Sequence, residues 1–220
     1  EFSDWSSDVC SSDLSLVLLK PDAVCIRQAG IFVMERLRKA IPHFKLLAFE
    51  HHVVPAELGE QHYAEHKGKS FFGSLISMIT NPNGVYVIVI EGEDAIATIR
   101  KELGPTMVEK AVCQDCIRGH FGTCRGINCC HASDGVESAA REVELWTSFF
   151  KIELNEEKAE KNFAEFKAKY ENKFPGDMTK VREIVNKITE DTKEYVAAMK
   201  ELTDADEMMI KQLLATIILN

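Results

Sequence analysis

The sequence predicts a mixed α/β domain of the α+β type, with a four-stranded antiparallel sheet and helices, followed by an all-helical C-terminal extension. Three observations support this fold class. The composition of the 220-residue chain changes near residue 150, since all seven Cys and all seven His lie at or before His131. Before that point, four apolar or alternating runs have the pattern of strands, with helical periods between them. After Phe150 the chain is rich in Lys, Glu, Ala and long apolar side chains, with one Pro-Gly break at Pro175.

The order of these elements narrows the fold. Strands are expected at Ser15–Leu19, His43–Val53, Gly84–Glu91 and Arg125–Cys130, and helices at Gly30–Ala40, Pro55–Lys67, Ser70–Thr80 and Asp94–Leu103, with a further helix after Asp134. This order, β-α-β-(αα)-β-α-β-α, favours the split βαβ, ferredoxin-like βαββαβ arrangement over a doubly wound sheet. Helices on one face only would leave the other face of the sheet uncovered, and self-association is one way to cover it.

The C-terminal extension, residues 149–220, carries apolar side chains at helical spacing. An aromatic stripe before the Pro-Gly break predicts one helix. An apolar stripe after the break predicts a second helix, with Asp177 as its N-cap. Thr203–Asp206 has the spacing of a capping box that opens a last helix. We expect a helical hairpin packed on the domain or on another subunit. The stripes consist of Phe163, Phe166, Tyr170 and Phe174, then Val181, Ile184, Val185 and Ile188, and finally Ile210, Leu213, Leu214 and Ile217.

The first fourteen residues differ from the rest of the chain. They are rich in Ser and Asp and show neither an apolar period nor a targeting pattern. Asp8–Leu14 resembles the translation of a sequencing-library adapter, so we interpret residues 1–14 as a non-native leader. The expected organisation is therefore a leader over 1–14, an α/β domain over 15–148 and the helical extension over 149–220.

Composition argues against several classes of protein. The formal net charge of −9 argues against a sequence-independent nucleic-acid binder, because neutralising phosphates needs an excess of Lys and Arg. No apolar run approaches the roughly eighteen residues of a membrane span. The seven cysteines are odd in number and irregularly spaced, which favours reduced thiols in a cytoplasmic protein over a disulfide framework.

Two short motifs suggest a phosphate loop or a zinc site. Gly68–Ser70 matches the end of a phosphate-binding loop, but Tyr63 stands where the first Gly of that loop is needed. His62 and His66 fit the H-x-x-E-H pattern and could share a zinc ion on one helix, as in a zinc hydrolase. A five-residue match arises easily by chance, so a structural role for these histidines is the simpler interpretation.

A group of cysteines is a third candidate site. Cys113 and Cys116 have the C-x-x-C spacing of zinc and redox sites, and Cys124 and Cys129 follow. A second closely spaced pair of that kind is missing, and Cys also packs well as a small apolar side chain. Metal binding and simple packing both stay open for this group.

A histidine lies where a predicted strand leads into a helix. His131 follows that strand, and Asp134 and Glu137 have the spacing of an N-cap and N3 residue, so a helix should begin just past His131. The ring is then expected near the positive end of the helix dipole, which suits an anion. Glu142 lies three helical turns further on and can approach His131 only through tertiary packing.

Motifs between Ser15 and Trp146 occur together in a recognisable order. They are Leu19–Val24, His62–Lys69 with Phe71 and Phe72, Val89–Gly92, Arg100, Leu103–Thr106, Ile117–Thr123, Ile127 and Asn128, His131–Asp134, and Glu137–Glu142. In order and approximate spacing, this region resembles a nucleoside diphosphate kinase. The resemblance implies a ferredoxin-like phosphotransferase that moves the γ-phosphate of ATP to nucleoside diphosphates by a ping-pong exchange through a phosphohistidine. The implied products are GTP, CTP, UTP and the deoxynucleoside triphosphates.

The resemblance also implies roles for individual side chains. His131 matches the nucleophile, Glu142 the acid that orients its ring, Ser133 the neighbouring hydroxyl and Tyr63 a supporting tyrosine. An imidazole is largely uncharged near neutral pH and is nucleophilic without a separate base. Nucleotide binding is implied for Lys20, Phe71, Arg100, Thr106, Arg118 and Asn128, with Phe71 stacking on the base.

Cofactor and assembly follow from the same resemblance. Mg²⁺ is expected to bridge phosphate oxygens of the nucleotide and not to occupy an all-protein cage. Fixed positive charge and positioning carry phosphoryl transfer, which explains the Lys and Arg residues in the set. The implied partners are ATP and nucleoside diphosphates, with no nucleic acid and no membrane. A homo-oligomer, either a dimer-based tetramer or a hexamer, is expected.

The chain departs from the family pattern at several points. Met107–Cys116 is longer than the usual loop and lacks its Asn-Pro and Pro-Gly-Thr elements, which bear on subunit contacts. His120 replaces a common acidic residue. Ala132 replaces the Gly after the nucleophile, and it would be strained if that backbone needed positive φ. The alternative hypothesis is a non-catalytic nucleotide-binding relative whose helical tail docks a partner.

Overall fold

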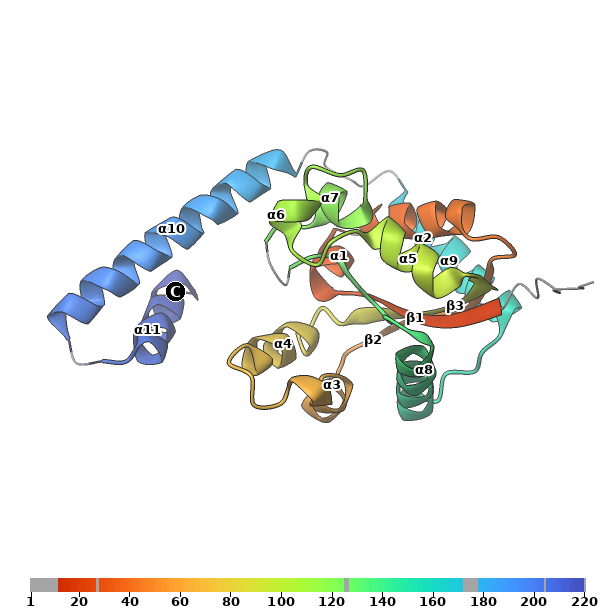
Figure 1. The fold of residues 1–220 in the computed structure, drawn as a ribbon, viewed down its shortest axis with the longest axis horizontal. Helices are drawn as coiled ribbons and strands as arrows, with labels where there is room; N and C mark the ends of the chain where they lie inside the picture. The colour runs from red at the N-terminus through yellow and green to blue at the C-terminus, as the bar shows by residue number, and fades with distance from the viewer. Residues whose placement is uncertain (1–11, 27, 125–126, 172–177, 204, 220) are drawn as a thin grey trace, which may run out of the picture. The chain divides into compact units, whose positions relative to one another are not determined.

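The structure is a computed structural model that describes residues 12–26, 28–124, 127–171, 178–203 and 205–219. It divides into two compact units, Glu1–Gly176 and Asp177–Asn220. The first unit contains the sheet, and helices α10 (Thr179–Leu202) and α11 (Glu207–Leu219) belong to the second (Figure 1). No helix among the described residues is both long and apolar enough to cross a lipid bilayer.

Four strands form the sheet of the first unit. They are β1 (Ser12–Leu19), β2 (Lys45–His52), β3 (Val85–Glu93) and β4 (Cys130–Ala132). The strands lie in the order β2-β3-β1-β4, and every neighbouring pair is antiparallel. This is the order of the split βαβ fold, so the predicted ferredoxin-like, four-stranded antiparallel sheet is confirmed. In this register Leu18 of β1 lies opposite His131 of β4.

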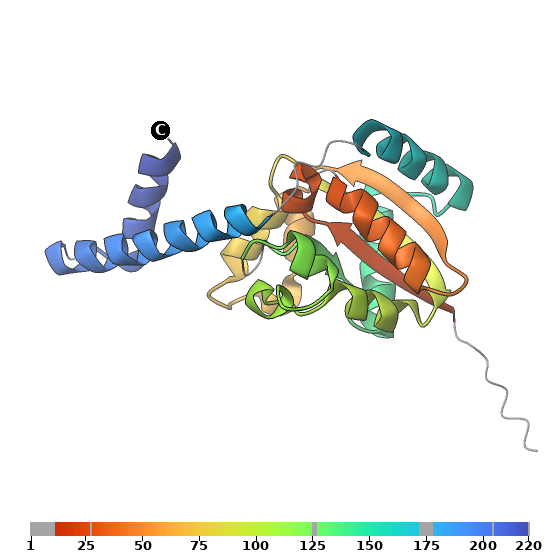
Figure 2. The same ribbon diagram turned by 90° about the horizontal axis from the view of Figure 1, so that it is seen from above.

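One face of the sheet is covered by α2 (Gln28–Ala40), α5 (Ala95–Leu103) and α9 (Glu156–Tyr170), as Figures 1 and 2 show. Side chains of a strand alternate between the two faces of a sheet. Val17 and Leu19 of β1 accordingly pack in this core with Ile88 and Ile90 of β3. The apolar stripes predicted for the helices supply the other half of the core.

The opposite face is covered by α3 (Ala56–His62), α4 (Phe72–Ile79) and α8 (Val136–Phe150). Leu16 and Leu18, the alternate residues of β1, pack there with Leu58, Val143 and the fully buried Trp146. Both faces are thus covered within one chain. The uncovered face expected from the sequence does not exist, and it gives no reason for self-association.

Helix α9 belongs to the first unit, which extends past the expected domain end at residue 148. Phe163 and Phe166 are buried in the core, each with its ring 5.3 Å from that of Phe49 on β2. The segment also covers the outer edge of β2, where Asn155 N–H donates to Leu47 O at 2.9 Å and Asn162 Nδ2–H to Phe49 O at 3.1 Å. Only the part of the extension from Asp177 onwards forms a separate unit.

Several boundaries differ from the predicted ones. β1 begins at Ser12, inside the expected leader, because residues 12–14 pair with β3. The helix predicted over Pro55–Lys67 ends at His62, and a 3₁₀ helix, Ala64–His66, follows. Three short helices, α1 (Pro21–Cys25), α6 (Val108–Ala111) and α7 (Ile117–Phe121), were not predicted. They have at most five residues, which is too short for a helical period to show in the sequence.

The strand and helix around His131 are shifted towards the C-terminus. β4 begins at Cys130, where the predicted strand ended, and residues 125–126 lie outside the described part. α8 begins at Val136 with Gly135 as N-cap, so Asp134 is not the cap that the sequence predicted. Ser138, the N3 residue, closes this end of the helix with its side chain: its Oγ accepts from Gly135 N–H at 2.9 Å and donates to Asp134 Oδ1 at 2.6 Å.

The second unit is helical, as predicted for this part of the extension. α10 and α11 contact each other, and Lys200 of α10 forms an ion pair with Glu207 of α11 at 2.9 Å. Asp206 is the cap of α11, since its Oδ1 accepts from Met209 N–H at 2.9 Å; the predicted capping box placed the cap at Thr203. The predicted cap Asp177 and the stripe residue Phe174 lie outside the described residues.

Candidate active site

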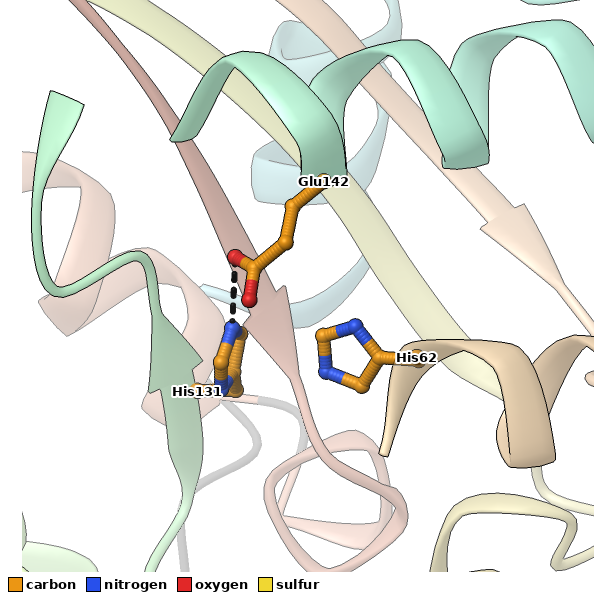
Figure 3. Close-up of side chains that lie close together, drawn as sticks. All are labelled: His62, His131 and Glu142. Atoms are coloured by element: carbon orange, nitrogen blue, oxygen red, sulfur yellow. Dashed lines mark hydrogen bonds and ion pairs between the residues drawn. The ribbon is translucent and has the colours of Figure 1, made fainter. Parts of the chain in front are cut away.

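Three side chains predicted to act together meet between β4 and α8. His131 Nε2 and Glu142 Oε2 are 2.9 Å apart (Figure 3), and Ser133 Oγ donates to the same Oε2 at 2.7 Å. Ser133 is fixed to the central strand, because Leu16 N–H donates to its Oγ at 3.3 Å. The bond to Glu142 occupies Nε2 of His131, which leaves Nδ1 as the ring nitrogen available for chemistry.

The charge on Glu142 follows from these contacts. Burial alone would raise its pKa, but hydrogen bonds from His131 and Ser133 and the positive charge of a protonated His131 lower the pKa to about 2. The carboxylate is therefore ionised at physiological pH. Because it accepts at Nε2, it favours the neutral tautomer of His131 that has its proton on Nε2 and a lone pair on Nδ1.

A second histidine packs against this group. The ring of His62, the last residue of α3, lies 4.5 Å from the ring of His131 at an interplanar angle of 83° (Figure 3). Trp146 Nε1–H donates to His62 Nδ1 at 3.2 Å. Burial, followed by the charge of His131, lowers the pKa of His62 to about 3. His62 begins one of the motifs that carry the family resemblance and directly precedes the predicted site residue Tyr63, but no role was predicted for it beyond the possible zinc pair.

Tyr63 and Phe71 join this centre through a series of rings. Tyr63 is buried, and burial together with the charge of Glu142 raises its pKa. Its ring lies 4.6 Å from that of His62 and 6.1 Å from that of His66, which in turn is 5.6 Å from the ring of Phe71. Phe71 is 47% exposed at the end of the series. An exposed aromatic face at this place can stack on a planar ligand.

A second group, built around two buried cations, contains four of the predicted nucleotide-binding residues. Lys20 Nζ donates to Asn128 Oδ1 at 2.8 Å, and Asn128 Nδ2–H donates to Thr106 O at 2.9 Å. Arg118 Nη1–H donates to Gly104 O at 2.8 Å. Arg118 Nη2–H donates at 2.9 Å to the carbonyl of Cys130, the residue before His131, which ties this group to the histidine.

The buried cations make this region attractive to an anion. Burial lowers the pKa of Lys20 to about 8, against the opposing charge of Asp22 and with the help of Arg118. Burial also lowers the pKa of Arg118, and the exposed Arg100 on α5 adds to that shift. Arg118 Nε is buried and has no hydrogen-bond partner among the described residues. A bound phosphate would offset the cost of burying these charges.

The sequence suggested two candidate metal sites, the pair His62 and His66 and a group of four cysteines. The structure assembles neither of them among the described residues. His62 ends α3 and His66 belongs to the next 3₁₀ helix, so the two do not share one helix face as the zinc alternative required. In the described part of the chain, the group with ligand atoms close enough for a metal is His62, His131 and Glu142, within 4.8 Å of one another. The four cysteines do not form such a group there; Cys116 and Cys129 are buried, and Cys113 is exposed.

The residue after His131 has an ordinary strand backbone. Ala132 pairs with Val17 in the sheet, and it is absent from the described residues with positive φ. The left-handed residue here is Cys129, at φ 70°, whose N–H donates to Asp22 Oδ2 at 2.9 Å. The methyl group of Ala132 therefore causes no backbone strain beside His131.

Comparison with known proteins identifies the family. A sequence model described as nucleoside diphosphate kinase matches residues 13–154 of this chain, which contain all ten predicted site residues. The chain belongs to the nucleoside diphosphate kinase family. The family and the enzyme class expected from the sequence are thereby confirmed.

Individual relatives agree with this assignment. The nucleoside diphosphate kinase of Staphylococcus epidermidis is 42% identical over 132 residues, which are 60% of this chain and 85% of the relative. That of Mycobacterium bovis is 40% identical over 135 residues, covering 61% and 96%.

Solved structures agree as well. The nucleoside diphosphate kinase of Aquifex aeolicus superposes with a TM-score of 0.57 at 31% identity, covering 62% of this chain and 95% of the other. The Halobacterium salinarum enzyme, determined in complex with CDP, has a TM-score of 0.57 at 33% identity and covers 62% and 88%. The nucleoside diphosphate kinase match ends at residue 154, so α9, α10 and α11 lie beyond it.

Proposed function

We propose that this protein transfers the γ-phosphate of ATP to nucleoside diphosphates in two steps, with Nδ1 of His131 as the intermediate phosphate acceptor. The observation that carries the proposal is the 2.9 Å contact between His131 Nε2 and the ionised Glu142. It fixes the proton on Nε2 and leaves the lone pair of Nδ1 for attack on phosphorus. Family membership supports the same reaction.

The two steps are reciprocal. In the first, Nδ1 attacks the γ-phosphorus, the bond from phosphorus to the β,γ-bridging oxygen breaks, and the nucleoside diphosphate leaves. The ring then carries a positive charge, which the carboxylate of Glu142 stabilises through Nε2–H. In the second step, a terminal oxygen of another nucleoside diphosphate attacks the phosphorus and the bond from phosphorus to Nδ1 breaks. The histidine returns to its starting state, and GTP, CTP, UTP or a deoxynucleoside triphosphate is the product.

The remaining site residues are proposed to hold the nucleotide. Lys20 and Arg118 supply buried positive charge for the transferring phosphate, and Arg100 adds a third cation at the protein surface. Thr106 and Asn128 are placed beside them to bind phosphate or ribose oxygens. Phe71 offers its exposed ring to the base. Since every base has a π face, stacking suits an enzyme that uses several nucleotides.

Magnesium is proposed to enter with the nucleotide, as part of the substrate complex. Mg²⁺ requires oxygen ligands, whereas the three-ligand group of the described residues contains two imidazoles. The cations Lys20 and Arg118 instead fit the phosphates that carry the metal ion. Bound to phosphate oxygens, Mg²⁺ supplies further positive charge to the transferring group.

Cellular setting and assembly are part of the same proposal. We infer a cytoplasmic enzyme with reduced thiols that forms a dimer-based tetramer or hexamer and binds neither nucleic acid nor membranes. Such an assembly must leave α9 in place on the outer edge of β2, because this segment hydrogen-bonds the edge carbonyls of Leu47 and Phe49. We also infer that the catalytic domain runs from β1 to near residue 148, with α9 packed on it as an added element.

A labelling experiment tests the proposal. The full chain is incubated with Mg²⁺ and ATP labelled at the γ-phosphate, then quenched in base and in acid. We expect one acid-labile phosphate per chain, which GDP removes as labelled GTP. His131→Ala should abolish both labelling and GTP formation. As a control, His51→Ala should retain both, because His51 is exposed on β2, where its ring bonds the Asn83 carbonyl. GTP formation by His131→Ala would refute the mechanism, and nucleotide binding without any transfer by the wild type would favour the non-catalytic alternative.

A further inference from the structure

His62 has a buried ring nitrogen that the proposed reaction does not use. Its Nε2 is inaccessible to solvent and has no hydrogen-bond partner among the described residues. A buried polar group without a partner costs about 1–3 kcal/mol, so such an atom needs an explanation. The edge of the His62 ring that carries Nε2 faces the flat face of the His131 ring in Figure 3, and the two rings are nearly perpendicular.

Trp146 determines which nitrogen of His62 carries the proton. The indole N–H is a donor only, and it points to His62 Nδ1 at 3.2 Å. Nδ1 must therefore accept. Burial keeps His62 uncharged, so its single ring proton is on Nε2. A protonated Nε2 has no lone pair for a metal ion, and this excludes His62 as a zinc ligand at Nε2 as long as Trp146 donates to Nδ1.

We propose that His62 is a positioning residue for the phosphate acceptor: Trp146 fixes it as the Nε2–H tautomer, and this N–H points at the face of the His131 ring and favours its neutral, nucleophilic form. The proposal rests on the proposed function of His131. An N–H directed at the π face of a neutral imidazole is attractive, whereas the same dipole opposes a positive charge on that ring. Perpendicular packing against His62 also limits rotation of His131 away from Glu142.

The charged and titratable groups around this pair come from several elements. Glu142 and Arg141 approach from α8, with Arg141 Nη2 at 3.7 Å from the free oxygen of Glu142. Lys20, which follows β1, and Arg141 both oppose protonation of His62, and Glu142 favours it. Tyr63 packs against His62, with the two rings 4.6 Å apart, and is uncharged. Glu142 thus stabilises a proton on His131 while His62 opposes a second one, and the two together select the state with one proton on Nε2.

Two variants separate the effect of the His62 N–H from the effect of ring packing against His131. His62→Phe keeps an aromatic ring against His131 and removes the donor. Trp146→Phe keeps the buried ring and removes the group that fixes the tautomer. His51→Phe is the matched control, because the same exchange is made on the exposed surface of β2. Thermal unfolding of each variant shows whether it is folded before its activity is measured.

The first readout is a pH titration of the resting enzyme, monitored by ¹H–¹⁵N NMR of the histidine rings. We expect wild-type His62 to show the neutral Nε2–H pattern from about pH 5 to pH 8. A wild-type His62 that titrates in this range or carries its proton on Nδ1 overturns the proposal. None of these results depends on phosphate transfer.

The second readout is the pH profile of His131 phosphorylation. In His62→Phe the rate near pH 6 should fall about threefold relative to His51→Phe, and near pH 8 the two should agree within about twofold. Trp146→Phe should shift the profile in the same direction. A loss merely from disturbed packing would lower the rate equally at all pH values, and that outcome refutes the role of the N–H. If wild-type His131 takes no phosphate at all, the proposed function fails, while the NMR titration still decides the role of His62.

Discussion

His131 and Glu142 are eleven residues apart in the sequence, yet their side-chain atoms Nε2 and Oε2 lie 2.9 Å apart. The chain achieves this by placing His131 on the short strand β4 and Glu142 two turns into α8, which packs on the adjacent strand β1. Ser133 connects both parts, since it hydrogen-bonds β1 through Leu16 and donates to Glu142. The orientation of the proposed nucleophile is thus set by packing of α8 on the sheet.

Replacing Glu142 by Gln should slow phosphorylation of His131 about tenfold to a hundredfold, because a charge-assisted hydrogen bond becomes a neutral one. The amide keeps the size of the side chain but no longer stabilises the positive charge that the ring acquires. Rapid-quench measurement of labelled enzyme gives the rate. The matched control is Glu137→Gln in the first turn of α8, an exposed site that should keep the wild-type rate. Equal rates in the two variants would show that the carboxylate does not orient His131.

The low pKa of Glu142 predicts acid sensitivity of the fold. Its pKa is about 2 in the native state and near 4.5 in the unfolded chain, so the unfolded state binds the proton more tightly. The stabilisation is complete above about pH 4.5 and is lost as the pH falls towards about 2. Urea unfolding between pH 6 and pH 3 should show a smaller loss of stability in Glu142→Gln than in the wild type. An identical pH dependence in both proteins would contradict the assigned ionisation of Glu142.

Lys20 should make nucleotide binding sensitive to alkaline pH. Burial lowers its pKa to about 8, so the free enzyme loses this positive charge as the pH rises through that value. The affinity for ADP, measured by calorimetry, is expected to fall between about pH 7 and pH 9 in the wild type. In Lys20→Met, binding should be weaker at pH 7 and nearly independent of pH over this interval. An affinity in Lys20→Met that falls as in the wild type would assign the effect to another group.

The fold could be predicted because β1, β2 and β3 show their patterns within a few residues, whereas the three-residue β4 was predicted too early in the chain. Alternation in β1 separates Leu16 and Leu18 from Val17 and Leu19, and the structure places these pairs in different cores. The contact of His62 with His131 and Trp146 could not be predicted in this way. It joins residues that are 69 and 84 positions apart, and no local spacing encodes such a contact. The predicted site residues came from resemblance to a family, whereas their hydrogen bonds came only from the structure.

For a similar reason, the sequence did not determine the surface on which α9 packs. Its aromatic stripe indicated burial but not the surface that buries it, and the domain or another subunit both stayed possible. The structure shows Phe163 and Phe166 packed against Phe49 of the same chain. Gly30 of α2 allows this approach, because a Cβ there would lie 3.0 Å from the ring of Phe166. Two ring contacts and two hydrogen bonds of this segment thus fall on β2, within one unit.

Removing the buried ring of α9 should destabilise the first unit and expose an edge strand. Phe166→Ala is expected to lower the free energy of unfolding by about 3 kcal/mol, the usual cost of deleting a buried phenyl ring. Once α9 separates, the outer carbonyls of Leu47 and Phe49 lose their donors, and open edge strands pair readily. Urea unfolding and light scattering at increasing concentration test both effects. Ile184→Ala, at an exposed site of α10, is the control that should change neither. An unaltered Phe166→Ala variant would show that α9 is not part of the core in solution.

Ala132 provides a test of the backbone next to the nucleophile. It sits in β4 opposite Val17, it is 2% exposed, and its φ lies outside the left-handed region. A glycine there gives no relief of strain, and it adds flexibility while removing a buried methyl group. Ala132→Gly should therefore keep the rate of phosphorylation within about twofold and lower the unfolding free energy by about 1 kcal/mol. A faster and more stable Ala132→Gly variant would mean that the alanine strains the strand beside His131. The same two measurements on Ala140→Gly, at an exposed site of α8, separate the effect of strand geometry from the general cost of a glycine.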